Sequence, residues 1–448
     1  MFSFGRENTG LVAKWWRNVD KQILFLFAFL LLLGLFFSFS STTSVISEKM
    51  NKQTYFFFIK HLIFVSVSLL LIFTISIQEK DKLIKVLTYL FIVSIVLLFL
   101  TLIVGVEIKG SRRWVGFDSF LRFQPVELLK PLFIIFVAKI MVLNEKTDIH
   151  KRYFYSFVIL LAIVTILILA LVPVFGVEIK GSKRFMDLRI FPLFQPVELV
   201  KPLFIIFVAK IIILNEKINV YRRYLYSFLV LLLIVLFLIN QPDLGQTLLL
   251  TLTWITMIFV SGFNMFILSI LGLVFVGIIG LLIFFFPGKF GYVFLRIKTF
   301  LDPKVGDNFQ SQKALEAIKQ GGLTGQGMGE GILKDKVPEA HTDYIIAVIS
   351  EEFGAIFVLF IVIIFLFVGY RVLNKVFAGN DEFLKLALVG LISLLIIQTF
   401  IHIGVNSRLF PTTGMTLPFL SYGGSSLIGS SIIAGIILNF TRKDSIRY

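Results

Sequence analysis

Long apolar runs recur from one end of the sequence to the other. Most are about 18 to 25 residues long, enough for an α-helix to cross a hydrocarbon layer of roughly 30 Å. Hydrophobic residues occupy 57% of the 448 positions. A water-soluble domain cannot cover so much apolar surface, because its solvent-facing positions need polar side chains. The sequence therefore predicts an all-α polytopic membrane protein, with residues 1–448 forming a single membrane domain.

About twelve of these runs are expected to be transmembrane helices. Basic clusters between them fall on one side of the membrane when the N-terminus is cytoplasmic, so the positive-inside rule places both termini in the cytoplasm. A large extracytoplasmic loop over 287–341 then precedes the span at 342–371. The expected spans are 22–40, 55–77, 86–104, 125–143, 153–173, 197–214, 224–239, 246–260, 264–286, 342–371, 384–405 and 420–440.

The net charge of +16 is interpreted first as orientation and as contact with anionic membrane lipids. No basic stretch leaves the membrane-embedded context, which argues against a nucleic-acid partner. Three basic segments lie on the outer side, where the positive-inside rule does not expect them, and they are candidates for binding an anionic group. These segments are 107–122, 178–189 and 289–336. The chain has no cysteine, which excludes disulfides and a cysteine-ligated metal site.

Part of the chain is repeated at a constant offset of 71 residues. The sequence Val-Glu-Ile-Lys-Gly-Ser at 106–111 recurs at 177–182, and residues 130–140 recur without change at 201–211. We interpret this as one tandem duplication, because solenoid and inverted-repeat proteins show more copies or far greater divergence. The unit contributes two spans, so everything downstream keeps its side of the membrane. The duplicated units are 92–162 and 163–233.

The long polar loop has recognisable parts. Residues 290–300 mix aromatic side chains with basic ones, which is typical of an element lying in the membrane interface. Residues 311–320 are expected to form a short helix. The segment 321–331 contains six glycines, and it is either a backbone cradle for phosphate or a flexible connector.

Three carboxylates follow this loop. Asp343 lies at the mouth of an apolar helix, where it is either used in chemistry or caps the helix N-terminus. Glu351 and Glu352 lie two to three turns further in, and carboxylates at that depth are functional or salt-bridged. The segment 411–426 combines prolines, glycines and hydroxyl side chains, which indicates broken helix that protein or a water-filled cavity must satisfy.

A second polar group accompanies the repeat. In the second copy it consists of Lys180, Arg184, Gln195, Glu198 and Lys201. Glu198 and Lys201 are three residues apart, so they share a helix face and can pair. The first copy offers an alternative set, which is Arg113, Trp114, Gln124, Glu127 and Lys130.

Four motifs together resemble the SEDS family of shape, elongation, division and sporulation proteins, and more closely its cell-division branch. They are Pro-Glu-Ala-His-Thr-Asp-Tyr at 338–344, Glu-Glu-Phe-Gly at 351–354, Asn-Gln-Pro-Asp-Leu-Gly-Gln at 240–246, and the Gly- and Ser-rich sequence at 414–426. The family has a helical bundle of ten spans, and the duplication accounts for two more here. The family places Trp after the motif arginine. The first copy keeps this order at Arg113 and Trp114, whereas the second, which we favour as the working copy, has Phe185.

The resemblance implies a glycosyltransferase that polymerises lipid II, the undecaprenyl-pyrophosphate-linked disaccharide-pentapeptide, at the periplasmic face of the inner membrane. Asp343 is then the general base, and Lys180, Arg184 and Lys201 stabilise the departing pyrophosphate. The other implied substrate-binding residues are Gln195, Glu198, His341, Ser421 and Tyr422. A divalent cation is left open as an aid, without a dedicated set of ligands. The implied partners are a class B penicillin-binding transpeptidase and other divisome proteins at the division septum.

Two other functions suit the same features. A lipid II flippase also needs many spans, intramembrane charges and broken helices. Against it, the carboxylate and the cations gather on the outer side, without a matching inner polar set. A non-catalytic division scaffold is the other alternative, if the duplication has abolished activity.

Overall fold

The computed structural model describes residues 10–41, 56–78, 243–264, 287–302, 309–378 and 381–443 almost completely, together with the strands of two hairpins and isolated helical residues between 201 and 280. The described part is mainly helical. Its helices are α1 (Leu11–Asn18), α2 (Lys21–Ser41), α4 (Phe56–Ile77), α10 (Leu244–Val260), α12 (Pro287–Leu301), α13 (Phe309–Gly321), α14 (Ile345–Ala378), α15 (Glu382–Asn406) and α16 (Gly424–Phe440), with a 3-10 turn at Lys334–Lys336.

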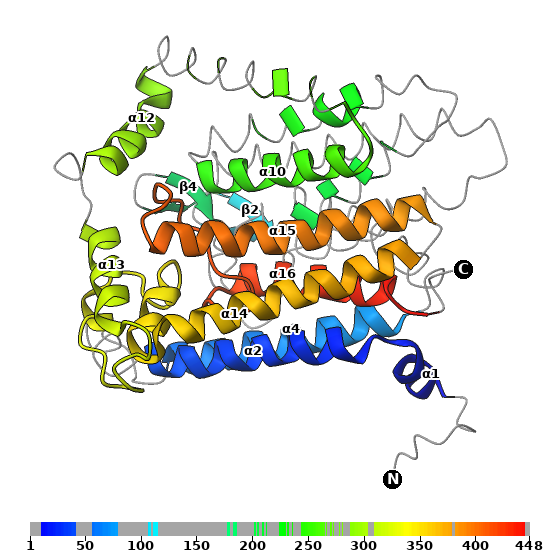
Figure 1. Ribbon diagram of the computed structural model, residues 1–448, viewed down its shortest axis with the longest axis horizontal. Helices are drawn as coiled ribbons and strands as arrows, with labels where there is room; N and C mark the ends of the chain where they lie inside the picture. Colours follow the sequence, from blue (N-terminus) through cyan, green and yellow to red (C-terminus); the bar gives the residue numbers. More distant parts are fainter. Residues whose placement is uncertain are drawn as a thin grey trace.

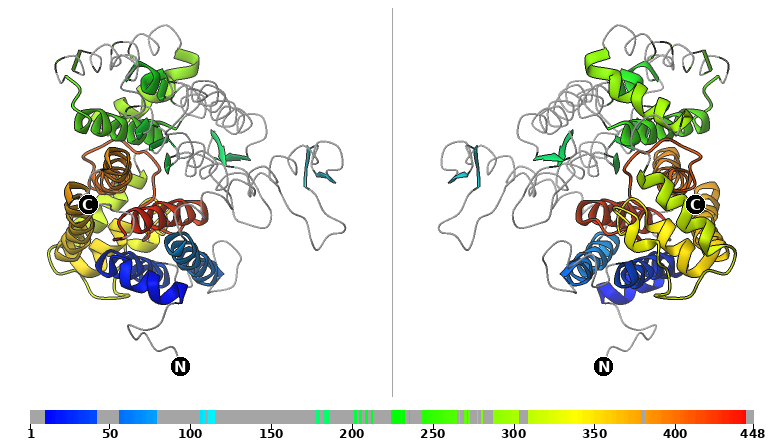
Figure 2. Two further views of the ribbon diagram at one scale, coloured as in Figure 1. Left: turned by 90° about the vertical axis from the view of Figure 1, so that its right-hand side faces the viewer. Right: turned by 90° about the vertical axis from the view of Figure 1, so that its left-hand side faces the viewer.

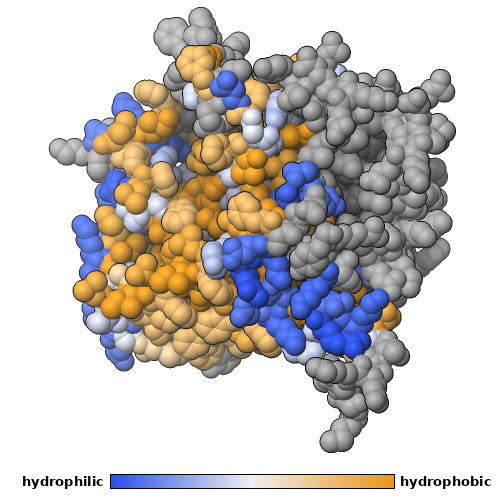
Figure 3. All heavy atoms as spheres, turned by 45° about the vertical axis from the view of Figure 1, so that its right-hand side comes forward, coloured by the Kyte–Doolittle hydropathy of each residue, from blue (hydrophilic) through white to orange (hydrophobic). Residues whose placement is uncertain are grey.

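The long helices run side by side as one bundle, with α12 and α13 at one end and α1 and the C-terminus at the other (Figure 1). Four described helices are long and apolar enough to cross a membrane, and two shorter apolar ones accompany them. Figure 3 shows the corresponding surface, in which an apolar band separates polar side chains gathered toward the ends. The predicted membrane-protein class is confirmed.

Six of the expected spans correspond to described helices, namely α2, α4, α10, α14, α15 and α16. The short helix expected at 311–320 and the interfacial element at 290–300 correspond to α13 and α12. The spans expected at 86–104, 125–143 and 153–173 lie outside the described residues. Those at 197–214, 224–239 and 264–286 are described only at isolated helical positions. The total of twelve spans and the orientation therefore stay predictions.

The all-α expectation is corrected at the two copies of the repeat. Strand β1 (Val106–Ile108) pairs antiparallel with β2 (Ser111–Trp114), and β3 (Val177–Ile179) pairs with β4 (Ser182–Phe185) in the same register. The sequence between the strands is Lys-Gly in both copies, and a two-residue connection with glycine favours a tight hairpin. Figure 2 shows β3–β4 nearer the helical bundle and β1–β2 farther out.

The second copy of the repeat contributes directly to the hydrophobic core. Phe204, Ile205, Val208, Ala209 and Ile212 are all buried in the main core cluster. A methyl group on Gly390 of α15 would collide with Ile205, so the two segments pack in close contact. The corresponding residues of the first copy lie outside the described part of the chain.

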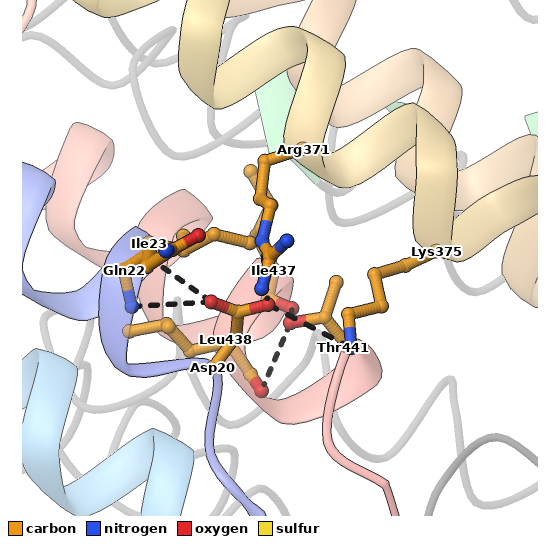
Figure 4. A network of polar contacts seen from close by, with 8 residues as sticks. All are labelled: Asp20, Gln22, Ile23, Arg371, Lys375, Ile437, Leu438 and Thr441. Atoms are coloured by element: carbon orange, nitrogen blue, oxygen red, sulfur yellow. Dashed lines mark hydrogen bonds and ion pairs between the residues drawn. The ribbon is translucent and has the colours of Figure 1, made fainter.

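A buried aspartate ties the helices together at the end that carries the termini (Figure 4). One carboxylate oxygen of Asp20 accepts from the backbone amides of Gln22 and Ile23, at 3.2 and 3.3 Å, and so caps α2. The other lies 3.2 Å from Nε of Arg371 and 3.7 Å from Nζ of Lys375 on α14. This pairing fixes the start of α2 against the last turns of α14.

At the opposite end, the glycine-rich segment 321–331 supplies hydrogen-bond donors to carbonyls next to a break in α14. Gly354 has a φ of +79°, which interrupts the helical hydrogen bonds. The carbonyls of Glu351 and Glu352 instead accept from the amides of Gln326 and Gly327, at 2.9 and 3.0 Å. Both sequence interpretations of 321–331 are thereby corrected, because these amides bind α14 and the segment is hydrogen-bonded in place.

Candidate active site

Asp343 lies two residues before the start of α14, at the end of the bundle that carries α12 and α13. Its backbone carbonyl accepts a hydrogen bond of 3.1 Å from Nδ2 of Asn406, the last residue of α15. Its carboxylate lies against the segment after α15, because a Cβ added to Gly414 would stand 3.5 Å from Oδ2 of Asp343. Gly414 has a φ of +69°, a conformation that side chains rarely adopt. Two of the motifs found in the sequence therefore meet at one carboxylate.

A cation from the long polar loop reaches the same place. Arg296 on α12 donates through Nη1 to the carbonyl of Thr412 across 3.1 Å. The pKa of Tyr344 is raised above its ordinary value mainly by burial and further by the negative charge of Asp343, while the positive charge of Arg296 opposes the shift. The charges of Asp343 and Arg296 therefore both reach the Tyr344 hydroxyl, with opposite effects on its pKa.

One face of α15 holds the site together. Gln398, His402 and Asn406 are spaced four residues apart, which puts them on one side of the helix. Gln398 donates to the carbonyl of Thr416 at 2.9 Å, and Nδ1 of His402 contacts the carbonyl of Met415 at 2.7 Å. The sequence analysis did not single out Gln398 or Asn406. Their signal was present in the sequence, as polar residues at every fourth position of an otherwise apolar helix.

Lys201 continues this polar face into the duplicated region. Its side chain is only 1% exposed, and Nζ donates to Oε1 of Gln398 at 3.3 Å. Gln398 and Asn406 are eight residues apart on α15, which corresponds to roughly 12 Å along the helix axis. Lys201 of the second copy therefore contacts one end of the row formed by Gln398, His402 and Asn406, and Asp343 contacts the other end.

The predicted residues His341, Ser421 and Tyr422 brace the turn before Asp343. The hydroxyl of Ser421 donates to the carbonyl of Thr342 at 2.7 Å and accepts from the amide of Leu417 at 2.9 Å. The amide of Tyr422 donates to the carbonyl of His341 at 2.9 Å, and their rings lie 5.6 Å apart. Burial lowers the pKa of His341 below its usual range and raises that of Tyr422 to about 12. Contact of these residues with substrate stays a prediction.

Glu351 and Glu352 are salt-bridged or bonded to backbone. Lys334 lies 2.6 Å from Oε1 of Glu352, and the hydroxyl of Ser40 on α2 donates to Oε2 of Glu352. Oε1 of Glu351 accepts from the amide of Leu333 at 2.7 Å. The salt-bridged interpretation holds for Glu352, and both carboxylates anchor the long loop onto α14.

The remaining predicted site residues either lie in the hairpin strands, where only the backbone is described, or lie outside the described part of the chain. The side chains of Arg184, Arg113 and Trp114 belong to hairpin strands and are not described. Val177 pairs with Phe185 as Val106 pairs with Trp114, so both aromatic residues take the same place in the hairpin backbone. The residues outside the described part are Lys180, Gln195, Glu198, Gln124, Glu127 and Lys130. Among the described residues, no group of three or more His, Asp or Glu side chains is arranged to hold a metal ion.

The fold and this site define a polytopic membrane protein with a carboxylate-centred site at one end of its helical bundle. Comparison with known proteins assigns this membrane protein to a family. The family profile described as "Cell cycle protein" (FtsW, RodA, SpoVE) matches residues 21–164 and 149–446. The chain therefore belongs to this family, the SEDS family, as its sequence motifs predicted.

Individual proteins similar to this chain carry names from the same family. The probable peptidoglycan glycosyltransferase FtsW of Caulobacter vibrioides (strain NA1000 / CB15N) is 37% identical over 296 residues, covering 66% of this chain and 73% of that protein. Stage V sporulation protein E of Bacillus subtilis (strain 168) is 33% identical over 367 residues, covering 79% of this chain and 96% of that protein.

The fold is also found in a solved structure described as "Structural coordination of polymerization and crosslinking by a peptidoglycan synthase complex". The match has a TM-score of 0.55 and 22% identity, and it covers 94% of this chain and 97% of that chain. At this identity the similarity establishes the fold alone.

Proposed function

We propose that this chain is a peptidoglycan glycosyltransferase of the cell-division type, which polymerises lipid II into glycan strands at the outer face of the bacterial inner membrane. Relatives named peptidoglycan glycosyltransferase FtsW support the activity. The structural observation that carries the proposal is the position of Asp343, whose carboxylate lies beside Gly414 and whose backbone is held by Asn406.

Asp343 acts as the general base. It takes the proton from the 4-hydroxyl of the acceptor sugar as that oxygen attacks the anomeric carbon of the lipid-linked donor. The new C–O bond forms while the bond from the anomeric carbon to the pyrophosphate oxygen breaks, so the configuration inverts. Undecaprenyl pyrophosphate leaves with the electron pair. Attack and departure occur on opposite sides of the anomeric carbon, so base and cations stand on opposite sides of it.

Cations stabilise the departing pyrophosphate. Lys201 at the far end of the α15 row, with Lys180 and Arg184 from the sequence of the second hairpin, would supply positive charge where negative charge develops. The burial of Lys201 supports this role, because a charge interacts more strongly where water is excluded.

The second copy of the repeat supplies these groups. Its helix residues, Lys201 among them, pack in the core against α15, and its hairpin lies nearer the bundle than that of the first copy (Figure 2). The proposed partner is a class B penicillin-binding transpeptidase, and the proposed location is the septum.

Reconstitution in liposomes tests the proposal against the flippase alternative. Purified chain, with its transpeptidase partner, is supplied with labelled lipid II, and both glycan strands and translocation are measured. A polymerase forms strands that a muramidase digests. Translocation of lipid II without any strands, under conditions where a ten-span relative polymerises, would favour the flippase. If neither glycan strands nor translocation is observed, the non-catalytic division scaffold becomes the better description.

A further inference from the structure

Three buried polar atoms around Asp343 have no hydrogen-bond partner within the described part of the chain. They are Oδ1 of Asn406, Nε2 of His402 and Oγ1 of Thr413. The residues are 0%, 1% and 6% exposed. Buried polar atoms are almost always paired, because leaving one unpaired is destabilising. Asn406 bonds the backbone of Asp343, His402 contacts Met415, and Thr413 and Met415 flank Gly414, which approaches the Asp343 carboxylate. Three unpaired atoms on these residues therefore indicate a ligand that completes them.

The known contacts determine what two of these atoms offer. Asn406 donates both amide hydrogens to carbonyls, to Asp343 at 3.1 Å and to His402 at 2.9 Å. Its amide orientation is thereby fixed, and Oδ1 is left as an acceptor. Nδ1 of His402 lies 2.7 Å from the carbonyl of Met415. Since a carbonyl only accepts, Nδ1 carries the hydrogen, and Nε2 of the neutral ring is also an acceptor.

Shared neighbours bring the three residues together. Thr413 and Met415 flank Gly414, which approaches the carboxylate of Asp343. A Cβ on Gly245, in the first turn of α10, would lie 2.9 Å from Cβ of Thr413 and 3.0 Å from Cγ of Met415. The start of α10 therefore covers one side of this segment, and the end of α15 covers another.

We propose that Asn406, His402 and Thr413 form a subsite for a neutral saccharide beside Asp343. Two acceptors and one hydroxyl match a ligand rich in O–H and acetamido N–H donors. They do not match a pyrophosphate diester, whose oxygens carry no hydrogen to donate at neutral pH. The inference rests on the proposed function and deepens it, because it assigns the side chains that hold the acceptor sugar while Asp343 takes its proton.

Thr413→Val tests the subsite, since it removes the hydroxyl with little change in shape. Thr399→Val is the matched control, because Thr399 is also buried, on α15, and its hydroxyl already donates to the carbonyl of Leu395 at 2.9 Å. Binding is measured in the Asp343→Asn background, where lipid II is expected to be consumed far more slowly than by the wild type. The probes are lipid II and undecaprenyl pyrophosphate, which lacks the sugars.

In that background we expect Thr413→Val to weaken binding of lipid II about 2- to 13-fold, the range for one lost hydrogen bond. Binding of undecaprenyl pyrophosphate and the melting temperature are expected to be unchanged. Thr399→Val is expected to lower the melting temperature without weakening binding, and Thr413→Ser, which keeps the hydroxyl, to bind as the parent chain does.

Equal binding of lipid II by the Thr413→Val chain and its parent would overturn the subsite, as would an equal loss for undecaprenyl pyrophosphate. Absence of lipid II binding in the parent chain would contradict both the subsite and the proposed function. If wild-type chain binds lipid II with this pattern but makes no glycan, the subsite stands and the polymerase proposal fails.

Discussion

The ammonium group of Lys334 lies 2.6 Å from Oε1 of Glu352, and their side chains are 5% and 0% exposed. The same carboxylate accepts from the amide of Gly329 at 3.2 Å and from the hydroxyl of Ser40. The pair joins the long polar loop to α14 and α2, only a few turns from Asp343. Its removal therefore tests how the loop is held over the site.

Lys334→Met is expected to lower the free energy of unfolding by about 3–5 kcal/mol, because it leaves the carboxylate of Glu352 buried without its charged partner. The double variant Lys334→Met/Glu352→Gln removes both charges and should be less destabilised than the single one. Thermal unfolding in detergent measures the effect. Lys313→Met is the control, since its 2.6 Å pair with Glu316 is solvent-exposed and worth about 1 kcal/mol at most. Equal losses at both lysines would contradict this account.

The break in α14 gives a second prediction. Gly354 and Gly329 have similar φ values of +79° and +83°, so alanine at either position is strained by about 1–2 kcal/mol. A Cβ at Gly354 also collides with the backbone of Leu323, whereas no described atom lies within 4 Å of one at Gly329. Gly354→Ala should therefore destabilise the chain far more than Gly329→Ala, as judged by melting temperature and by proteolysis of the 321–331 segment. Similar effects would mean that the segment does not seal the break.

His341 makes stability depend on pH. Burial holds its pKa below the ordinary value of 6.5, although Glu339 opposes the shift. Below about pH 6.5 the unfolded chain binds more protons at this residue than the folded chain does, so stability falls as the pH decreases toward the lowered pKa. His341→Phe keeps a ring against Tyr422 and removes the titration. Between about pH 7.5 and about pH 5.5 the variant should lose less melting temperature than the wild type. An identical loss would show that His341 does not contribute.

The duplication predicts that one unit is dispensable. Deletion of 92–162 removes two spans and leaves the second copy, whose Lys201 and Ile205 pack in the described core. The shortened chain should insert, fold and polymerise lipid II. Deletion of 92–126 is the control, because it removes one span and reverses the side of everything downstream. Failure of the longer deletion to fold or insert would contradict the tandem duplication.

Run length was sufficient to predict the spans that the structure describes, because a membrane-crossing helix must be long and apolar. It was not sufficient for the hairpins, whose strands are only three or four residues long and rich in charge. The role of the glycine-rich segment was not predicted, because it depends on the break in α14 at Gly354. In the sequence that break appears only as a single glycine within an apolar helix.

The site was predicted only in part, because some of its residues stand out in their local sequence and others are brought in by the fold. Asp343 was identifiable as a carboxylate in an apolar context. Asn406 contacts it from 63 positions away in the chain, and a single sequence carries no signal for such a distant contact. The face shared by Gln398, His402 and Asn406 was readable as a four-residue spacing, but its targets, the carbonyls of Thr416, Met415 and Asp343, depend on the fold.

The central claim is that Asp343 removes the acceptor proton, and the rate of lipid II polymerisation tests it most directly. Initial rates are compared for the wild type, Asp343→Asn and Asp302→Asn, the last being an exposed aspartate of the same polar loop. The account predicts a loss of about 10²- to 10⁴-fold for Asp343→Asn, the usual contribution of a general base, and an unchanged rate for Asp302→Asn. Polymerisation by folded Asp343→Asn at the wild-type rate would contradict it.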